Sequence, residues 1–149
     1  MAQTRFGSDA PRQVEAVRSL AEALIHFEKN LNVRKTQDVI LSGARVGAVY
    51  VIDGENRKYL VLYKRERYLY FSRHFPQVPD KDQAIIANIK LVHWAAMQEM
   101  GIATVFPDGS CYAVKASEFW TFYERWITEH PKLPGEIALP VRRWTRIIE

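Results

Sequence analysis

The 149-residue sequence has few of the residues that mark special classes of protein. It contains one cysteine, Cys111, so no internal disulfide can form, which predicts a reducing, cytoplasmic compartment. Seven Gly and seven Pro are too few for a collagen-like or low-complexity chain. No apolar run approaches the roughly 20 residues of a membrane span, and the N-terminus is too polar for a signal peptide. We therefore expect an intracellular protein without membrane partners.

The usual spacings of metal, nucleotide and nucleophile sites are also missing. No His-x-x-x-His or Cys-x-x-Cys pattern suggests zinc, and the scattered glycines form no phosphate-binding loop. Cys111 has no identifiable histidine partner, so we interpret it as a small core residue. We expect no cofactor, apart from Mg²⁺ if the protein is active. The four histidines are widely separated: His26, His74, His93 and His130.

What the sequence does contain is typical of one globular domain. Hydrophobic residues make up 48% and aromatic residues 12%, enough apolar area to offset the entropy of ordering the chain. No repeat or linker interrupts it, so we expect a single domain over residues 1–149. Its core should span about residues 9–130, followed by a Pro-rich basic tail at 131–149.

The periodicity predicts an α/β (α+β) protein with the order α, β, β, β, α, β and a further strand and helix. The first helix should begin at Asp9 and end near Asn30, before a polar connection and a short apolar piece at 39–41. Strands at 46–52, 58–64 and 67–72 should form an antiparallel meander. We then expect a helix from Asp80 to Met100 that ends at Gly101, strands at 102–106 and 111–115, a helix capped by Ser117, and an edge strand within 137–148.

The net charge of +4 is concentrated in one segment. Residues 55–74 hold six basic side chains against two acidic ones, which equals the surplus of the whole chain. Cations neutralise phosphates and tyrosine rings stack on bases, so this segment favours nucleic-acid binding; the alternative is a solvated surface. The C-terminal cluster around Trp144 either contacts a ligand or partner or forms an edge strand with exposed arginines. The candidate binding residues are Arg57, Lys58, Lys64, Arg65, Arg67, Arg73, Tyr68, Tyr70, Arg142, Arg143 and Arg146.

Residues 47–54, residues 58–64 and the pair Asp82-Gln83 carry a family resemblance. Their pattern resembles the restriction-endonuclease-like PD-(D/E)XK superfamily, and is most similar to archaeal Holliday junction resolvases. The resemblance covers roughly residues 10–115. It implies an αβββαβ core with a mixed sheet flanked by helices, and here an extra C-terminal strand, helix and extended tail. It also implies Mg²⁺-dependent cleavage of nucleic acid by acidic ligands and a lysine.

The sequence departs from that motif at both acids. Lys64 matches the motif lysine, but Leu62 stands where the second acid should be. Ala48 occupies the interior place of the first acid, and Asp53 lies only at the strand's end. A metal held by one carboxylate is poorly held, so the resemblance implies a nuclease-like fold that has lost its metal site. The alternative is a displaced site in which Glu66 and Asp53 act with Lys64, joined by Glu55 or by helix-borne Glu15 or Glu22.

Four hypotheses of function follow. The first is a nucleic-acid-binding protein on a nuclease-like scaffold without cleavage of its own, for which a homodimer is a plausible assembly. The second is a non-catalytic companion subunit of a larger nuclease, as in tRNA-splicing endonuclease assemblies. The third is a Mg²⁺-dependent endonuclease with a displaced acid, and the fourth is a structural or assembly protein.

Overall fold

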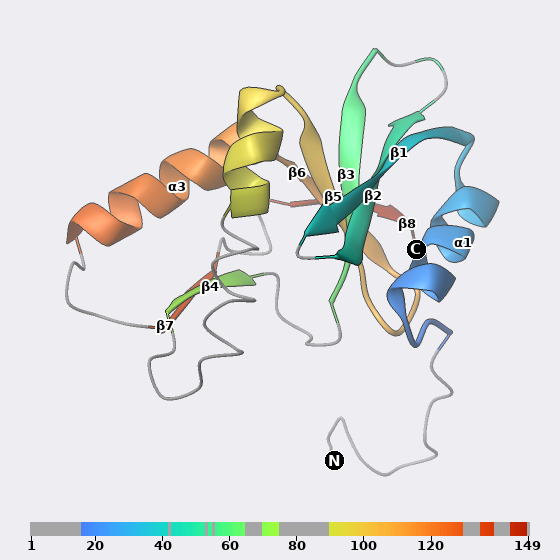
Figure 1. Cartoon of the computed structure of the whole chain (residues 1–149), viewed down its shortest axis with the longest axis horizontal. Helices are drawn as coiled ribbons and strands as arrows, with labels where there is room; N and C mark the ends of the chain where they lie inside the picture. Colours follow the sequence, from blue (N-terminus) through green and yellow to red (C-terminus); the bar gives the residue numbers. More distant parts are fainter. Residues whose placement is uncertain are drawn as a thin grey trace, which may run out of the picture.

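A computed structural model describes residues 16–41, 43–52, 54, 56–64, 70–74, 90–129, 135–138 and 144–148, with backbone alone for 70–74, 126 and 135–138. Figure 1 shows how the elements are arranged. Their bounds are α1 Leu20–Asn30, β1 Val33–Leu41, β2 Ala44–Ile52, β3 Lys58–Tyr63, β4 Tyr70–His74, β5 Gly101–Val105, β6 Cys111–Lys115, α3 Ala116–Glu129, β7 Gly135–Ala138 and β8 Thr145–Ile148. Residues 90–97 are also helical and are named the 90–97 helix below.

The fold is α+β, built around a six-stranded mixed sheet with the order β1-β2-β3-β5-β6-β8. Every neighbouring pair in this sheet is antiparallel except β3 and β5, which are parallel. A parallel pair needs a crossover connection, and the 90–97 helix lies in the segment between these two strands. The described chain runs from a helix through four strands to the second helix and then to β5, so it has one more strand before the second helix than we predicted.

Helices cover both faces of the sheet, which separates the core into two layers. α1 lies on one side, and the 90–97 helix and α3 lie on the other (Figure 1). On the α1 side, Phe27 packs with Tyr50 at a ring-centroid distance of 5.2 Å. On the other side, Phe119 meets Trp144 edge to face at 5.9 Å. Alternate residues of the central strands thus enter different layers, as strand geometry requires.

We predicted that the first helix begins at Asp9, but α1 begins at Leu20. Residues 16–19 are described and are not helical, so the prediction is wrong for them. Asp9 itself lies outside the described residues. Ser19 caps the helix by accepting a hydrogen bond from the Glu22 N–H at 3.2 Å. Val17, which we predicted to be on the helix, lies before it and is fully buried. Its N–H donates to the Pro107 carbonyl, and its own carbonyl accepts from the Tyr63 hydroxyl.

The first strand of the sheet was not predicted, because Arg34, Lys35 and Thr36 indicate a polar connection in the sequence. β1 pairs with β2 along nearly its whole length, with two register shifts. Only Val39 of its nine residues is buried. A strand at the edge of a sheet carries polar side chains on both faces, so it lacks the apolar alternation that a sequence search detects.

The predicted third strand of the meander does not join the main sheet. β4 pairs with β7 in a separate two-stranded sheet, and the place beside β3 is taken by β5. The meander is formed by β1, β2 and β3. Strand propensity identified the chain near residue 70 as extended, but pairing with β7 joins segments more than 60 residues apart and leaves no local signal.

Two helix boundaries also differ from expectation. The left-handed residue after the 90–97 helix is Glu99, with φ of 59°, and Gly101 begins β5 instead of ending the helix. Gly101 is needed for packing, because a Cβ there would lie 2.8 Å from the Tyr59 ring. α3 starts at Ala116, directly after β6, so Ser117 lies inside its first turn. The predicted cap at Asp80 is outside the described residues.

The remaining strands agree with expectation. β2, β3, β5 and β6 lie at or within a few residues of their predicted ranges. An edge strand is confirmed within 137–148: β8 pairs with β6, Trp144 is 6% exposed, and Arg146 lies on the surface. Cys111 is fully buried, and burial raises the pKa of its thiol to about 12, which agrees with a core residue. Among the helices that the structure describes, none has the length and apolar character to span a membrane.

Candidate nucleic-acid interface

The two positions that correspond to the motif acids lie in different layers of the core. Ala48 is fully buried on the α1 side, directly opposite Val61 of β3. Leu62 is 4% exposed and packs on the other side with Leu91 of the 90–97 helix. Apolar side chains in opposite layers cannot bring ligands to one ion.

A tyrosine and a carboxylate occupy the α1 side close to the Ala48 position. Tyr50 lies two residues along the same face of β2, and its hydroxyl donates to the Glu28 carboxylate at 2.5 Å. Burial, and then this hydrogen bond, raise the pKa of the tyrosine. The pair ties α1 to the sheet and satisfies a hydroxyl whose residue is fully buried.

Basic residues stand at the two ends of β3 on one face. Lys58 begins the strand, and Lys64 follows it and continues the parallel pairing through its N–H, which donates to the Val105 carbonyl at 3.0 Å. Both lysines are an even number of residues from Leu60 and Leu62, so they lie on the same face of the strand as these leucines, which pack under the helices. Six residues separate the two lysines by roughly 20 Å. The apolar core therefore lies between the two basic ends of this strand.

Arg34 of β1 lies near the N-terminal end of β3, a position that the sequence pattern did not indicate. Register places Arg34 of β1 opposite Val51 of β2, and Val51 opposite Lys58 of β3. Directly opposed residues point to the same face, so Arg34 and Lys58 are two strand spacings apart, roughly 10 Å. Both side chains are exposed, and no described residue forms an ion pair with either. Arg57, just before β3, donates to the Tyr59 hydroxyl at 3.5 Å on the opposite face.

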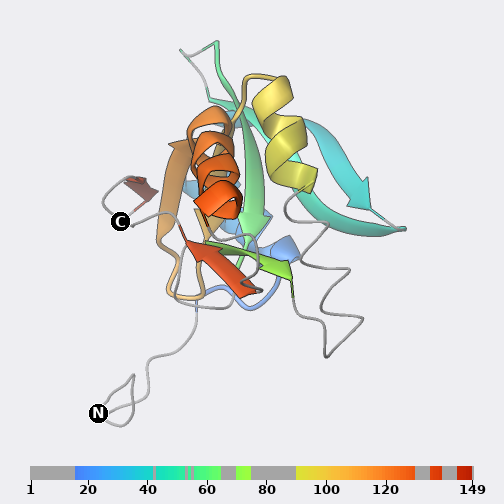
Figure 2. The same ribbon diagram turned by 90° about the vertical axis from the view of Figure 1, so that its left-hand side faces the viewer.

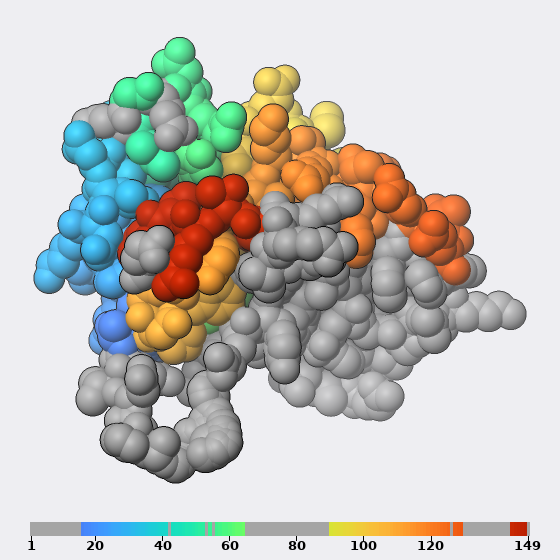
Figure 3. Space-filling model, turned by 180° about the vertical axis from the view of Figure 1, so that it is seen from behind, coloured from blue at the N-terminus to red at the C-terminus, as the bar shows by residue number. Residues whose placement is uncertain are grey.

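The other described member of the predicted set is Arg146 on β8. Its guanidinium lies over the Tyr112 ring of β6, 5.6 Å from the centroid, and its Nε donates to the Ile148 carbonyl. Figure 3 shows β8, in red, on the surface beside β6. Tyr112 therefore presents an aromatic face already paired with a cation, a contact that sequence spacing did not reveal.

Several predicted residues lie outside the described part of the chain or have only their backbone described there. Tyr70 and Arg73 belong to β4, whose side chains are not described. The others are Asp53, Arg65, Glu66, Arg67, Tyr68, Arg142 and Arg143. The displaced-acid hypothesis, which needs Asp53 and Glu66, stays a prediction.

Charge is distributed unevenly between strands and helices. Strands β1 to β3 carry four basic residues and one acidic residue. Helices α1 and α3 carry five acidic residues and two basic ones. The charged side chains of β1 to β3 therefore sum to +3, and those of α1 and α3 to −3.

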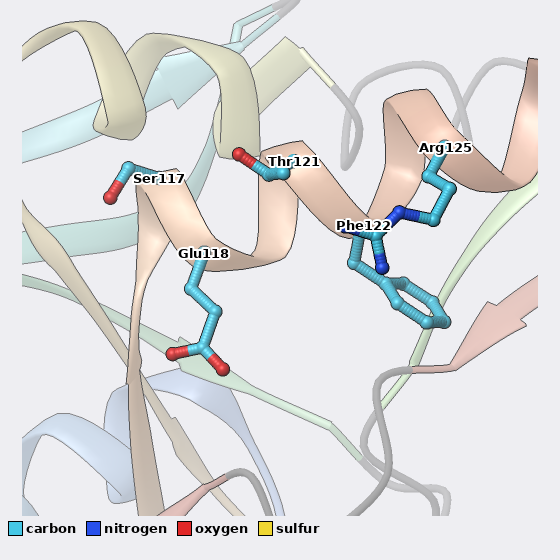
Figure 4. A pocket seen from close by; sticks show the side chains of 5 residues that line it. All are labelled: Ser117, Glu118, Thr121, Phe122 and Arg125. Atoms are coloured by element: carbon cyan, nitrogen blue, oxygen red, sulfur yellow. The ribbon is translucent and has the colours of Figure 1, made fainter.

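A hollow of about 250 Å³ lies along α3, as Figure 4 shows. The lining residues that the structure describes come from this one helix: Ser117, Glu118, Thr121, Phe122 and Arg125. The described lining includes one acid and one base, so these residues add no net charge that would attract a phosphate.

The described residues contain no group of three His, Cys, Asp or Glu side chains placed to share a metal ion. Comparison of the sequence with protein-family models and with curated proteins finds no match.

Proposed function

We propose that this protein binds nucleic acid through the edge of its sheet formed by β1, β2 and the start of β3. The observation that carries the proposal is the row of Arg34, Val51 and Lys58, which places two exposed cations on one face, neither of them in an ion pair with a described residue. Cations held this way by a rigid sheet bind phosphates through charge and release counterions. The acid-rich helices favour approach from this edge rather than from α1 or α3.

We further propose that the scaffold is a restriction-endonuclease-like one. The order of one helix, a three-stranded meander, a helix and a parallel fourth strand supports this proposal. Strand β6 and helix α3 follow this core, as the periodicity of the sequence predicts. The apolar, buried Ala48 and Leu62 support a protein that binds without cleaving at those positions.

Fluorescence anisotropy with labelled single-stranded, duplex and branched DNA and RNA tests the binding proposal. We expect salt-dependent binding by the wild type, and a loss of roughly tenfold at about 0.1 M salt for Arg34→Gln with Lys58→Gln. The slope of log affinity against log salt should fall by about 1.8, since two phosphate contacts are removed. Neutralising Arg65, Arg67 and Arg73 in the same assay tests the rest of the basic segment.

The matched control is Lys29→Gln with Arg125→Gln, which removes two charges from the helices. Equal losses in both double variants would show that total charge, not this edge, governs binding. The same probes incubated with and without Mg²⁺ test cleavage. Cleavage that disappears in Asp53→Asn or Glu66→Gln would overturn the non-catalytic proposal in favour of a displaced metal site.

A further inference from the structure

Three charged side chains converge on the open edge of the sheet, next to Arg34. Lys35 and Asp38 come from β1, and Arg45 comes from β2. The Lys35 ammonium lies 3.2 Å and an Arg45 guanidinium nitrogen 3.3 Å from the same oxygen, Asp38 Oδ1. Two cations from two strands therefore bind one anionic oxygen, which is the arrangement that proteins use to hold a phosphate oxygen.

The cluster is open to a large ligand. Its three side chains are between 37% and 39% exposed, and β1 is the outermost strand of the sheet. Figure 2 shows the β1–β2 hairpin projecting away from the helices. Register puts Lys35 opposite Tyr50 and Arg34 opposite Val51, so these adjacent cations point to the two faces of the edge strand. A backbone lying along this edge meets both.

We propose that Lys35 and Arg45 form a phosphate-contact point on this edge, and that Asp38 occupies it as an internal competitor of the nucleic-acid backbone. This inference rests on the proposed nucleic-acid binding and adds a device that limits its affinity. An exposed ion pair contributes little to folding, so a phosphate can take the place of the carboxylate without disturbing the strands. An Asp carboxyl is ionised at neutral pH, and the hydrogen bond from Lys35 lowers the pKa of Asp38 further, so the competitor carries its charge throughout the tested conditions.

The test measures the affinity of Asp38→Asn for a labelled DNA duplex of mixed sequence between about 50 and about 200 mM salt. We expect affinity to rise by roughly three- to tenfold, and the salt slope to steepen by up to about 1.8, because two cations become available to phosphates. Glu124→Gln, an exposed acid on α3, is the matched control and should change affinity by less than about twofold.

The effect must depend on the two cations. In a background of Lys35→Gln and Arg45→Gln, Asp38→Asn should no longer raise affinity. An equal gain in that background would reveal simple charge repulsion and overturn the proposal, as would an equal gain in Glu124→Gln. If the wild type binds in a salt-dependent way, the proposed function stands even when the role of Asp38 is overturned. If neither the wild type nor any variant binds, both the proposed function and the role of Asp38 are overturned. Circular dichroism melting curves of each variant establish that it is folded.

Discussion

β1 and β5 belong to the same sheet, but β1 is largely exposed to solvent and β5 is buried. One of nine β1 residues is buried, whereas all five residues of β5 are buried. β5 lies between β3 and β6 under helices on both faces, and β1 has a neighbour on one side only. The sheet therefore combines a rigid interior with an edge that carries charge at little cost in stability. Binding is accordingly proposed where the core contributes least.

The largest difference between the two regions should appear in core truncation. Phe27→Ala removes a fully buried ring that packs against Tyr50 and should lower the free energy of unfolding by about 3–5 kcal/mol. Ile40→Ala in β1 removes a side chain that is 54% exposed and should lower it by less than about 1 kcal/mol. Urea unfolding measures both. Similar losses would mean that β1 is as tightly packed as the interior.

Two glycines with positive φ sharpen the comparison. Gly43, at the hairpin tip, has φ of +80° and open space around a Cβ, so Gly43→Ala should lose about 1 kcal/mol of stability through backbone strain alone. Gly109, with φ of +89°, follows β5, and a Cβ there would lie 3.0 Å from His26 Nε2, which donates to the Gly109 carbonyl at 2.8 Å. Gly109→Ala should lose about 2–3 kcal/mol, because strain and a disturbed hydrogen bond add. Thermal unfolding of the two variants measures the difference, and equal losses would contradict tight packing of α1 on the β5–β6 turn.

The smallest effect concerns alkaline pH. Burial in the folded state raises the pKa of the Cys111 thiol from 9.0 to about 12. The protonated thiol therefore makes its full contribution to the free energy of unfolding below pH 9, and this contribution is lost as pH rises above that value. The unfolded chain releases this proton first, at up to about 1.4 kcal/mol per pH unit. Between pH 8 and 10 the wild type should lose about 1.4 kcal/mol more than Cys111→Ala in urea unfolding. Parallel curves would show that the thiol is accessible in the folded protein.

Much of the fold was predictable because its signals are local. Continuous apolar runs identified β2 and β3, and turn residues at Pro107 to Gly109 separated β5 from β6. β1 was missed because an edge strand has no buried face to impose a pattern. β4 was recognised as extended and given the wrong neighbour, since the choice between β3 and β7 depends on contacts distant in sequence.

The candidate site was predictable in composition and not in geometry. Lys58 and Lys64 stand out as basic residues beside an apolar strand, yet sequence does not reveal that helices pack between them. Arg34 belongs to the site only because register places it across Val51 from Lys58. The number of basic residues in the segment can be counted in the sequence. The face of the sheet on which they lie depends on strand pairing, which the sequence does not show locally.

By itself, the sequence determined most of the helices and strands but not β1, the location of the basic surplus, and the absence of acids at Ala48 and Leu62. These depend on residue type and short-range spacing, which the chain carries whatever its fold. Only the tertiary structure decided which strands are neighbours, that the two motif positions lie in opposite layers, and that Lys35, Asp38 and Arg45 meet on the open edge. Pairing register brings distant residues together, and a shift of one residue would turn each side chain to the other face.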